Sequence, residues 1–125
     1  PEVRFDPSAL LSVKGYIETS RKNDFDSEIT RLTAKGEPLY LWGCGAHLAR
    51  LLRSTSLAHG NIAAFVDNDP HKQKLTLLGK KIIGSQELTG LGGENTVVIC
   101  SPLYKTVMRE ELHNMRFAGH VEMLC

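Results

Sequence analysis

Five short runs with the pattern of β-strands alternate with helix-like patterns along most of the chain, and this alternation is the strongest constraint on its fold. The runs expected to be strands cover residues 39–42, 62–66, 80–83, 96–100 and 120–124. Apolar residues recur at helical spacing between them, as with Leu48, Leu51 and Leu52 after the first run. Strands that alternate with helices form a parallel sheet covered by helices on both faces.

The predicted architecture is a small α/β domain of Rossmann-like type over residues 38–125, with a parallel sheet of about five strands. Two helices are expected to precede it within residues 1–37 and to pack on the sheet as a lead-in. The first has apolar residues at helical spacing over 6–17, and the second over 25–35, where Gly36 supplies a C-terminal stop signal.

Shorter elements are expected between the strands. A helical segment over 71–73 leads toward Gly79, and a short helix covers 85–88. After the fourth strand, Ser101-Pro102 is expected to open a helix, because proline is favoured at the first helical position.

A glycine-containing turn follows the first strand. Residues 38–47 read Pro-Leu-Tyr-Leu-Trp-Gly-Cys-Gly-Ala-His, an apolar run that ends in two glycines before a helical pattern begins. Such a turn lets the backbone approach a phosphate, and the free N–H groups of a helix start point at its charge. A Gly-x-Gly pair alone is a weak signal, so the hypothesis depends on the rest of the chain.

Open parallel sheets bind ligands beyond the carboxyl ends of their strands, where the strand order reverses. In this topology the reversal is expected between the strands at 39–42 and 96–100. The candidate binding residues at this point are Gly43, Cys44, Gly45, Ala46, His47, Asp67, Asn68, Ser101 and Pro102.

Asp67 has two interpretations. It lies beyond the glycine turn at close to the roughly 20-residue spacing at which an acidic residue binds ribose hydroxyls. It also begins the sequence Asp67-Asn68-Asp69-Pro70, where a carboxylate can simply cap a turn.

Leu48 stands where a full Gly-x-Gly-x-x-Gly motif has its third glycine. That glycine permits close packing of helix on strand, so a leucine should push the helix outward or tilt it. The substitution makes the standard NAD seat less favourable.

Two side chains in the turn have reactive groups. His47 could donate a hydrogen bond to an anion or could be an ordinary exposed histidine. Cys44 is expected to have a pKa lowered by the helix N-terminus, but no base is identifiable beside it. Cys100 is expected to be a buried apolar residue. No catalytic residues and no metal site are therefore predicted.

Composition excludes several classes. Fifteen Lys and Arg stand against fourteen Asp and Glu, with no basic run, which argues against a nucleic-acid surface. No apolar stretch reaches membrane-spanning length. Three widely spaced cysteines indicate neither a disulfide framework nor a zinc site and favour a cytoplasmic location. The absence of an initial Met suggests a piece of a longer protein.

Three blocks give residues 39–124 a family resemblance. They are the glycine turn of residues 41–47, the block 64–73 with the pattern F-V-D-x-D-P-x-K-Q, and residues 78–83 followed by 85–88. Together they resemble the Rossmann-like nucleotide-binding domains attached to S-adenosylmethionine-dependent methyltransferases, including sugar C-methyltransferases, and to polysaccharide-biosynthesis proteins. The Gly-x-Gly-x-His pattern of related sugar acyltransferases is also present. The NAD-binding half of redox-sensing repressors is a more distant likeness.

The resemblance implies an accessory domain that holds a nucleotide-sugar or an S-adenosylmethionine-related nucleotide. Methyl transfer would then be done by a separate catalytic domain in the same polypeptide. The alternatives are an NAD(P)-binding enzyme or redox-sensing domain, and a scaffold that binds nothing.

Overall fold

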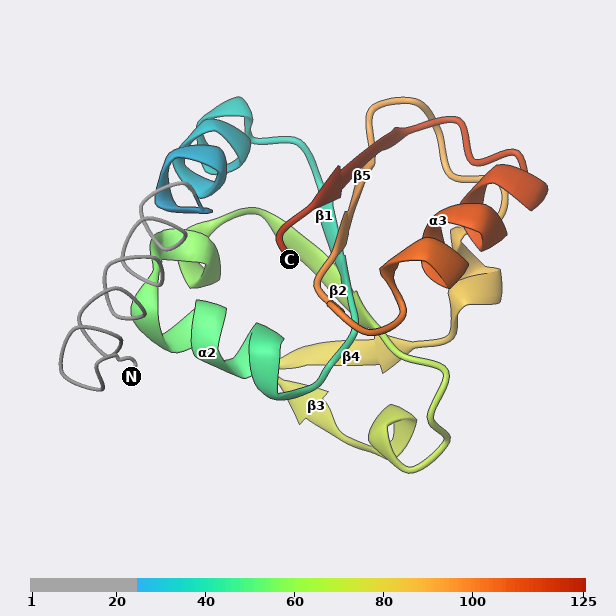
Figure 1. The fold of residues 1–125 in the computed structure, drawn as a ribbon, viewed down its shortest axis with the longest axis horizontal. Coiled ribbons are helices and arrows are strands. Elements are labelled where there is room, and N and C mark those ends of the chain that lie inside the picture. Colours follow the sequence, from blue (N-terminus) through green and yellow to red (C-terminus); the bar gives the residue numbers. More distant parts are fainter. Residues whose placement is uncertain (1–24) are drawn as a thin grey trace, which may run out of the picture.

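A six-stranded, mostly parallel sheet runs through the computed structural model, which describes residues 25–125 (Figure 1). The predicted first N-terminal helix lies outside the described residues. The strands are β1 (Leu39–Trp42), β2 (Ile62–Val66), β3 (Thr76–Leu77), β4 (Lys80–Ile83), β5 (Thr96–Ile99) and β6 (His120–Met123). Five of them match the runs predicted to be strands, so the α/β class is confirmed.

Three α-helices connect or flank the strands in this range. They cover residues 25–35, α2 (Ala46–Ser54) and α3 (Lys105–Asn114), and short 3-10 helices are η1 (Ser56–His59), η2 (Lys72–Lys74) and η3 (Ser85–Leu88). The helix over 25–35 ends at Gly36, which has φ +71° as its stop signal predicts. No helix among residues 25–125 is long and apolar enough to cross a membrane.

The sheet order is β3-β4-β2-β1-β5-β6. Strands β4, β2, β1, β5 and β6 are parallel, whereas β3 pairs antiparallel with β4. The expectation of a wholly parallel sheet of about five strands was therefore wrong in one respect. Leu78 and Gly79 both adopt positive φ, at 52° and 74°, and form the two-residue turn that folds β3 back on β4.

One helix prediction is confirmed and another needs correction. The short helix predicted over 85–88 is present as a 3-10 helix. The helix expected from Ser101-Pro102 begins at Lys105. The Ser101 hydroxyl oxygen accepts a hydrogen bond from the Tyr104 N–H at 3.2 Å, which forms a turn ahead of the helix.

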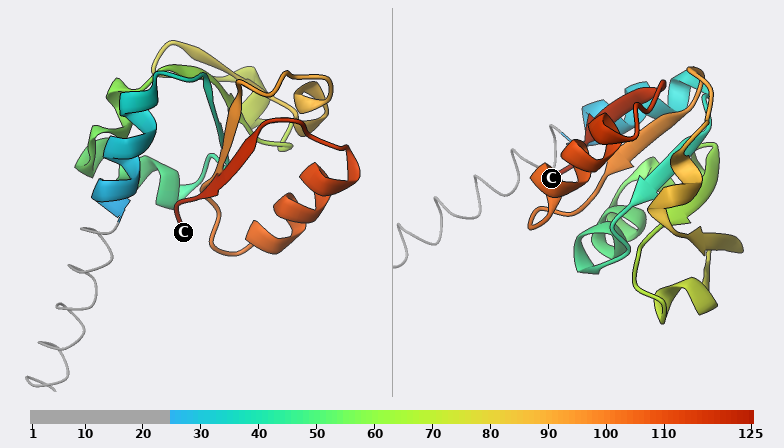
Figure 2. Two further views of the ribbon diagram at one scale, coloured as in Figure 1. Left: turned by 90° about the horizontal axis from the view of Figure 1, so that it is seen from above. Right: turned by 90° about the vertical axis from the view of Figure 1, so that its right-hand side faces the viewer.

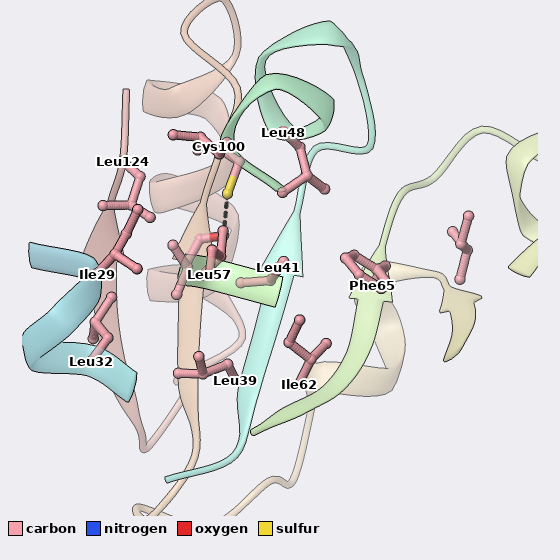
Figure 3. Close-up of a cluster of buried hydrophobic side chains, with 13 residues drawn as sticks. Ile29, Leu32, Leu39, Leu41, Leu48, Leu57, Ile62, Phe65, Cys100 and Leu124 are labelled. Carbon is pink, nitrogen blue, oxygen red and sulfur yellow. Dashed lines mark hydrogen bonds between the residues drawn. The ribbon is translucent and has the colours of Figure 1, made fainter. Parts of the chain in front are cut away.

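Each face of the sheet has its own hydrophobic core. One core joins the helix over 25–35 and α2 to the sheet through Ile29, Leu32 and Leu48, beside Leu124 at the end of β6. The other core lies under α3 and η3. Figure 2 shows the strands between these two helical layers, and Figure 3 shows Ile29 and Leu32 directed toward the strands. Helices therefore cover both faces, as the alternation predicts.

Leu48 is completely enclosed in the first of these cores. It shares the cluster with Leu41 of β1 and Phe65 of β2. The residue that replaces the third glycine is thus a core residue of α2, and side-chain packing holds this helix on the sheet.

Candidate functional site

The strand order reverses between β1 and β5, as the sequence predicts. From β1 the chain crosses to β2 on one side, and β5 lies on the other side. Helices α2 and α3 follow β1 and β5, so both begin at the same edge of the sheet (Figure 1). In open α/β sheets this position forms a crevice that binds ligands.

A cavity of about 470 Å³ lies at this edge. Its volume is in the range of small-molecule sites. All nine predicted candidate residues line it: Gly43, Cys44, Gly45, Ala46, His47, Asp67, Asn68, Ser101 and Pro102. The structure therefore brings together three segments that are far apart in the chain.

Position 43 requires a glycine, for reasons of both backbone angle and space. Its φ is +109°, a region that residues with a Cβ rarely adopt. A Cβ on Gly43 would lie 3.1 Å from the Cβ of Ser101 and 3.3 Å from the Cys100 carbonyl carbon. The glycine thus lets the turn after β1 approach the chain leaving β5.

Gly45 has a different role. Its φ is −112°, and a Cβ placed on it would meet no atom within 4 Å. It is the N-cap of α2 and offers no side-chain hydrogen bond to the first helical turn. Open space therefore lies in front of a helix N-terminus whose first amides lack a side-chain cap, which is the arrangement that favours an anion.

The carboxylate of Asp67 is bound on both oxygens. Oδ2 accepts a hydrogen bond from the Cys44 N–H at 3.0 Å, and Oδ1 accepts one from the Asp69 N–H at 2.9 Å. The side chain is only 17% exposed. Asp67 therefore does cap its turn and also holds the glycine turn. Its ribose-binding role remains a prediction that depends on the remaining lone pairs.

Lys72 is a site residue that the motif spacing did not single out. Its Nζ donates a hydrogen bond to the Cys44 carbonyl oxygen at 2.8 Å and lies 3.6 Å from Asp67 Oδ2. The side chain is 38% exposed and lines the cavity. The available signal was the block 64–73 itself, because its pattern F-V-D-x-D-P-x-K-Q contains Lys72.

His47 lines the cavity, but its ring is already engaged. Nε2 is hydrogen bonded to the Leu124 carbonyl oxygen, so Nε2 carries a proton. The ring also packs edge-on against Phe25, with 6.0 Å between centroids. In the neutral ring Nδ1 is then an acceptor, and donation to an anion requires the doubly protonated imidazolium.

The expectation for Cys44 was wrong. Burial raises the pKa of its thiol from the ordinary 9.0 to about 11, and the negative charge of Asp67 adds to the rise. Lys72 opposes the shift without reversing it. Cys44 is thus a poor nucleophile, in agreement with the absence of a base beside it in the sequence prediction. Cys100 is buried, as expected.

Apolar side chains also line the cavity and form an apolar wall. It consists of Trp42, Leu103, Tyr104, Val107 and Met108. Leu103 is 78% exposed, and Tyr104 and Val107 are also exposed. Exposed apolar side chains gathered at a cavity mark a binding surface. This surface was not predicted from the sequence.

A hydrogen-bonded network lies at the end of the cavity near β2 and α3. Asn68 Nδ2 donates to Ser85 Oγ at 2.9 Å, and the Ser85 N–H donates to Asn68 Oδ1 at 2.8 Å. The Ser85 hydroxyl donates to Glu111 Oε2. Asn68 and Glu111 line the cavity, whereas Ser85 is buried behind them. Glu111 lies on α3, and no motif signalled it.

Metal-binding chemistry has no support in the part of the chain that the structure describes. No group of three or more His, Cys, Asp or Glu side chains is arranged there to hold a metal ion.

Comparison with known families gives one match. A family model described as C2185-like, N-terminal, matches residues 37–120, a span that contains all nine candidate residues. No curated protein and no solved structure matches the chain.

Proposed function

The chain belongs to the C2185-like N-terminal family, and we propose that it serves there as an accessory nucleotide-binding domain of Rossmann-like type. One observation carries the proposal. The glycine turn, the end of β2 and the chain after β5 converge on one cavity at the reversal of strand order. The residues that the sequence predicts for phosphate and ribose binding thus line a single cavity.

The strand order supports the Rossmann-like assignment. Without β3, the order is β4-β2-β1-β5-β6, which is third-second-first-fourth-fifth among the parallel strands. Dinucleotide-binding folds have this order, with their ligands at the reversal. The assignment places a ligand phosphate at the start of α2, beside Gly45, and Lys72 offers the matching positive charge.

A nucleotide-sugar is the ligand class that the site favours. Gly45 leaves room for a phosphate, and Asp67 can accept from ribose hydroxyls with its remaining lone pairs. The apolar wall from Trp42 to Met108 offers a surface for a base or for the C–H face of a sugar. An S-adenosylmethionine-related nucleotide fits the same wall but makes less use of the anion site.

An NAD(P)-binding enzyme or redox-sensing domain is the second candidate. The acidic residue after β2 favours it, because an Asp at this position binds the ribose of NAD. Leu48 weighs against it, since the third glycine of the motif is replaced by a buried core residue.

A scaffold that binds nothing is the third candidate. It is favoured by the internal bonding of the site: both Asp67 oxygens, the Lys72 ammonium and the His47 Nε2 already have partners. A ligand would have to add to these contacts or displace some of them.

The proposal includes a catalytic partner. We infer from the sequence resemblance that this domain adjoins an S-adenosylmethionine-dependent methyltransferase domain of sugar or glycan biosynthesis, in a cytoplasmic protein. The word N-terminal in the family description is compatible with a further domain in the same polypeptide. This part of the proposal rests on the resemblance.

A thermal-unfolding panel ranks the candidates. A ligand at a hundredfold excess over its Kd stabilises the folded chain by about 2.7 kcal/mol. We expect UDP-glucose or dTDP-glucose to raise the unfolding midpoint more than NAD, S-adenosylmethionine or CoA at equal millimolar concentration. A larger rise with NAD would reverse the ranking, and no rise with any of them would leave the scaffold interpretation standing.

A further inference from the structure

Buried Ser85 is hydrogen bonded to two side chains that line the cavity, Asn68 and Glu111. Ser85 is 4% exposed, and its hydroxyl both accepts from Asn68 and donates to Glu111. The two outer residues come from different elements, the turn after β2 and helix α3. A buried serine that binds both of them fixes their positions relative to each other, which is what a preorganised site requires.

Each of these two side chains, Asn68 and Glu111, has one hydrogen-bonding group that is not used within residues 25–125. Ser85 binds Oε2 of Glu111. The other carboxylate oxygen, Oε1, accepts no hydrogen bond from residues 25–125. Asn68 Nδ2 has two N–H groups and uses one of them on Ser85. Two residues that line the cavity and share Ser85 as a hydrogen-bond partner thus retain one free acceptor and one free donor.

We propose that Asn68 and Glu111 form a hydroxyl-binding subsite for the sugar ring of a nucleotide-sugar. This inference rests on the proposed function and names the part of the ligand that occupies this end of the cavity. A hydroxyl group donates one hydrogen bond and accepts others, so it satisfies both free functions at once. Bonds of this kind to a charged carboxylate are the stronger ones.

Charge decides which part of the ligand occupies this end. The Glu111 carboxylate repels phosphate, so the diphosphate is directed to the uncapped start of α2 and the uncharged ring toward α3. Met108 lines the cavity one helical turn before Glu111 and supplies an apolar contact for the C–H face of the ring. The same carboxylate disfavours a second phosphate group in that place.

Calorimetric titrations with UDP and UDP-glucose test the subsite. The readout is the ratio of the UDP Kd to the UDP-glucose Kd. In Glu111→Gln we expect this ratio to fall roughly tenfold from the wild-type value, about the worth of one hydrogen bond to a charged group. Asn68→Ala, which removes the donor without changing any charge, should also lower the ratio.

Glu110→Gln is the matched control, because it removes the same charge from the neighbouring exposed position of α3 outside the cavity. Its ratio should equal that of the wild type. An unchanged ratio in Glu111→Gln overturns the inference, as does an equal loss of UDP and UDP-glucose affinity, which would assign the pair to the ribose. If Glu111→Gln does not fold, Asn68→Ala decides alone. If UDP and UDP-glucose both fail to bind the wild type, the proposed function itself fails.

Discussion

The carboxylate of Asp67, at the end of β2, accepts a hydrogen bond from the backbone N–H of Cys44, in the turn after β1, over 3.0 Å. This bond joins the two segments that the sequence motifs single out. It gives Asp67 a structural role in shaping the glycine turn, in addition to any contact with a ligand. The turn geometry should therefore depend on this side chain.

Asp67→Asn tests that dependence. Asparagine offers one acceptor oxygen where two backbone N–H groups, of Cys44 and Asp69, each need one. One donor is left unsatisfied, so we expect the free energy of unfolding to fall by about 1–3 kcal/mol in urea denaturation. Asp69→Asn is the control, because asparagine still provides the single oxygen that accepts from the His71 N–H. Equal losses in the two variants would contradict the account.

Gly43→Ala and Gly45→Ala should behave differently. In Gly43→Ala, an alanine must adopt a φ of +109°, and its Cβ lies 3.1 Å from the Ser101 Cβ. We therefore expect the free energy of unfolding to fall by about 1–3 kcal/mol. The second meets no atom and should cost less than about 1 kcal/mol as a change of N-cap. Its methyl group should instead weaken phosphate binding. Similar stability losses would mean that the turn is not held as described.

Cys44 should react slowly with iodoacetamide near neutral pH. The thiolate is the reactive form, and the pKa is raised from 9.0 to about 11. The alkylation rate, followed by peptide mass spectrometry, should keep rising up to about pH 11. The contribution of the neutral thiol to stability is present below pH 9.0 and is lost as the pH rises toward about 11. Asp67→Asn should move the alkylation profile to lower pH. Rapid alkylation of Cys44 at neutral pH would contradict this picture.

Lys72→Gln should affect binding more than stability. The side chain is partly exposed, so its loss should change the unfolding free energy by less than about 1 kcal/mol. Loss of the positive charge at the cavity should raise the Kd for UDP-glucose roughly tenfold. Lys74→Gln, at an exposed lysine of the same 3-10 helix outside the cavity, is the control. Equal changes in Kd would show that only overall charge matters.

Much of the fold follows from local sequence, because the central strands β1, β2 and β5 are largely apolar runs bounded by turn residues. The bounds of β1, β2 and β4 agree with the predicted runs. Strand β3 was missed because it has only two residues and ends in a turn with Leu78 at positive φ. Leucine gives no signal for that conformation, which asparagine or glycine would have given.

Some residues of the candidate site were predictable from the sequence and others were not. Residues in the turns after β1 and β2 were predictable because glycines and an acidic residue have fixed positions relative to strand ends. Glu111 and the apolar residues Leu103 and Tyr104 were not predictable, because their places depend on tertiary packing and on where α3 begins. Cys44 was misjudged because burial and the charge of Asp67 raise the pKa of its thiol, and both depend on tertiary structure.

Amide chemical shifts of the isotopically labelled chain, followed during titration with UDP-glucose, test the central claim most directly. We predict saturable shifts at Gly43, Gly45, Ala46 and His47, with smaller shifts at Asp67 and Asn68. The edge strand β3 and its turn should not respond. The absence of any shift from Gly43 to His47 at millimolar UDP-glucose would contradict the account.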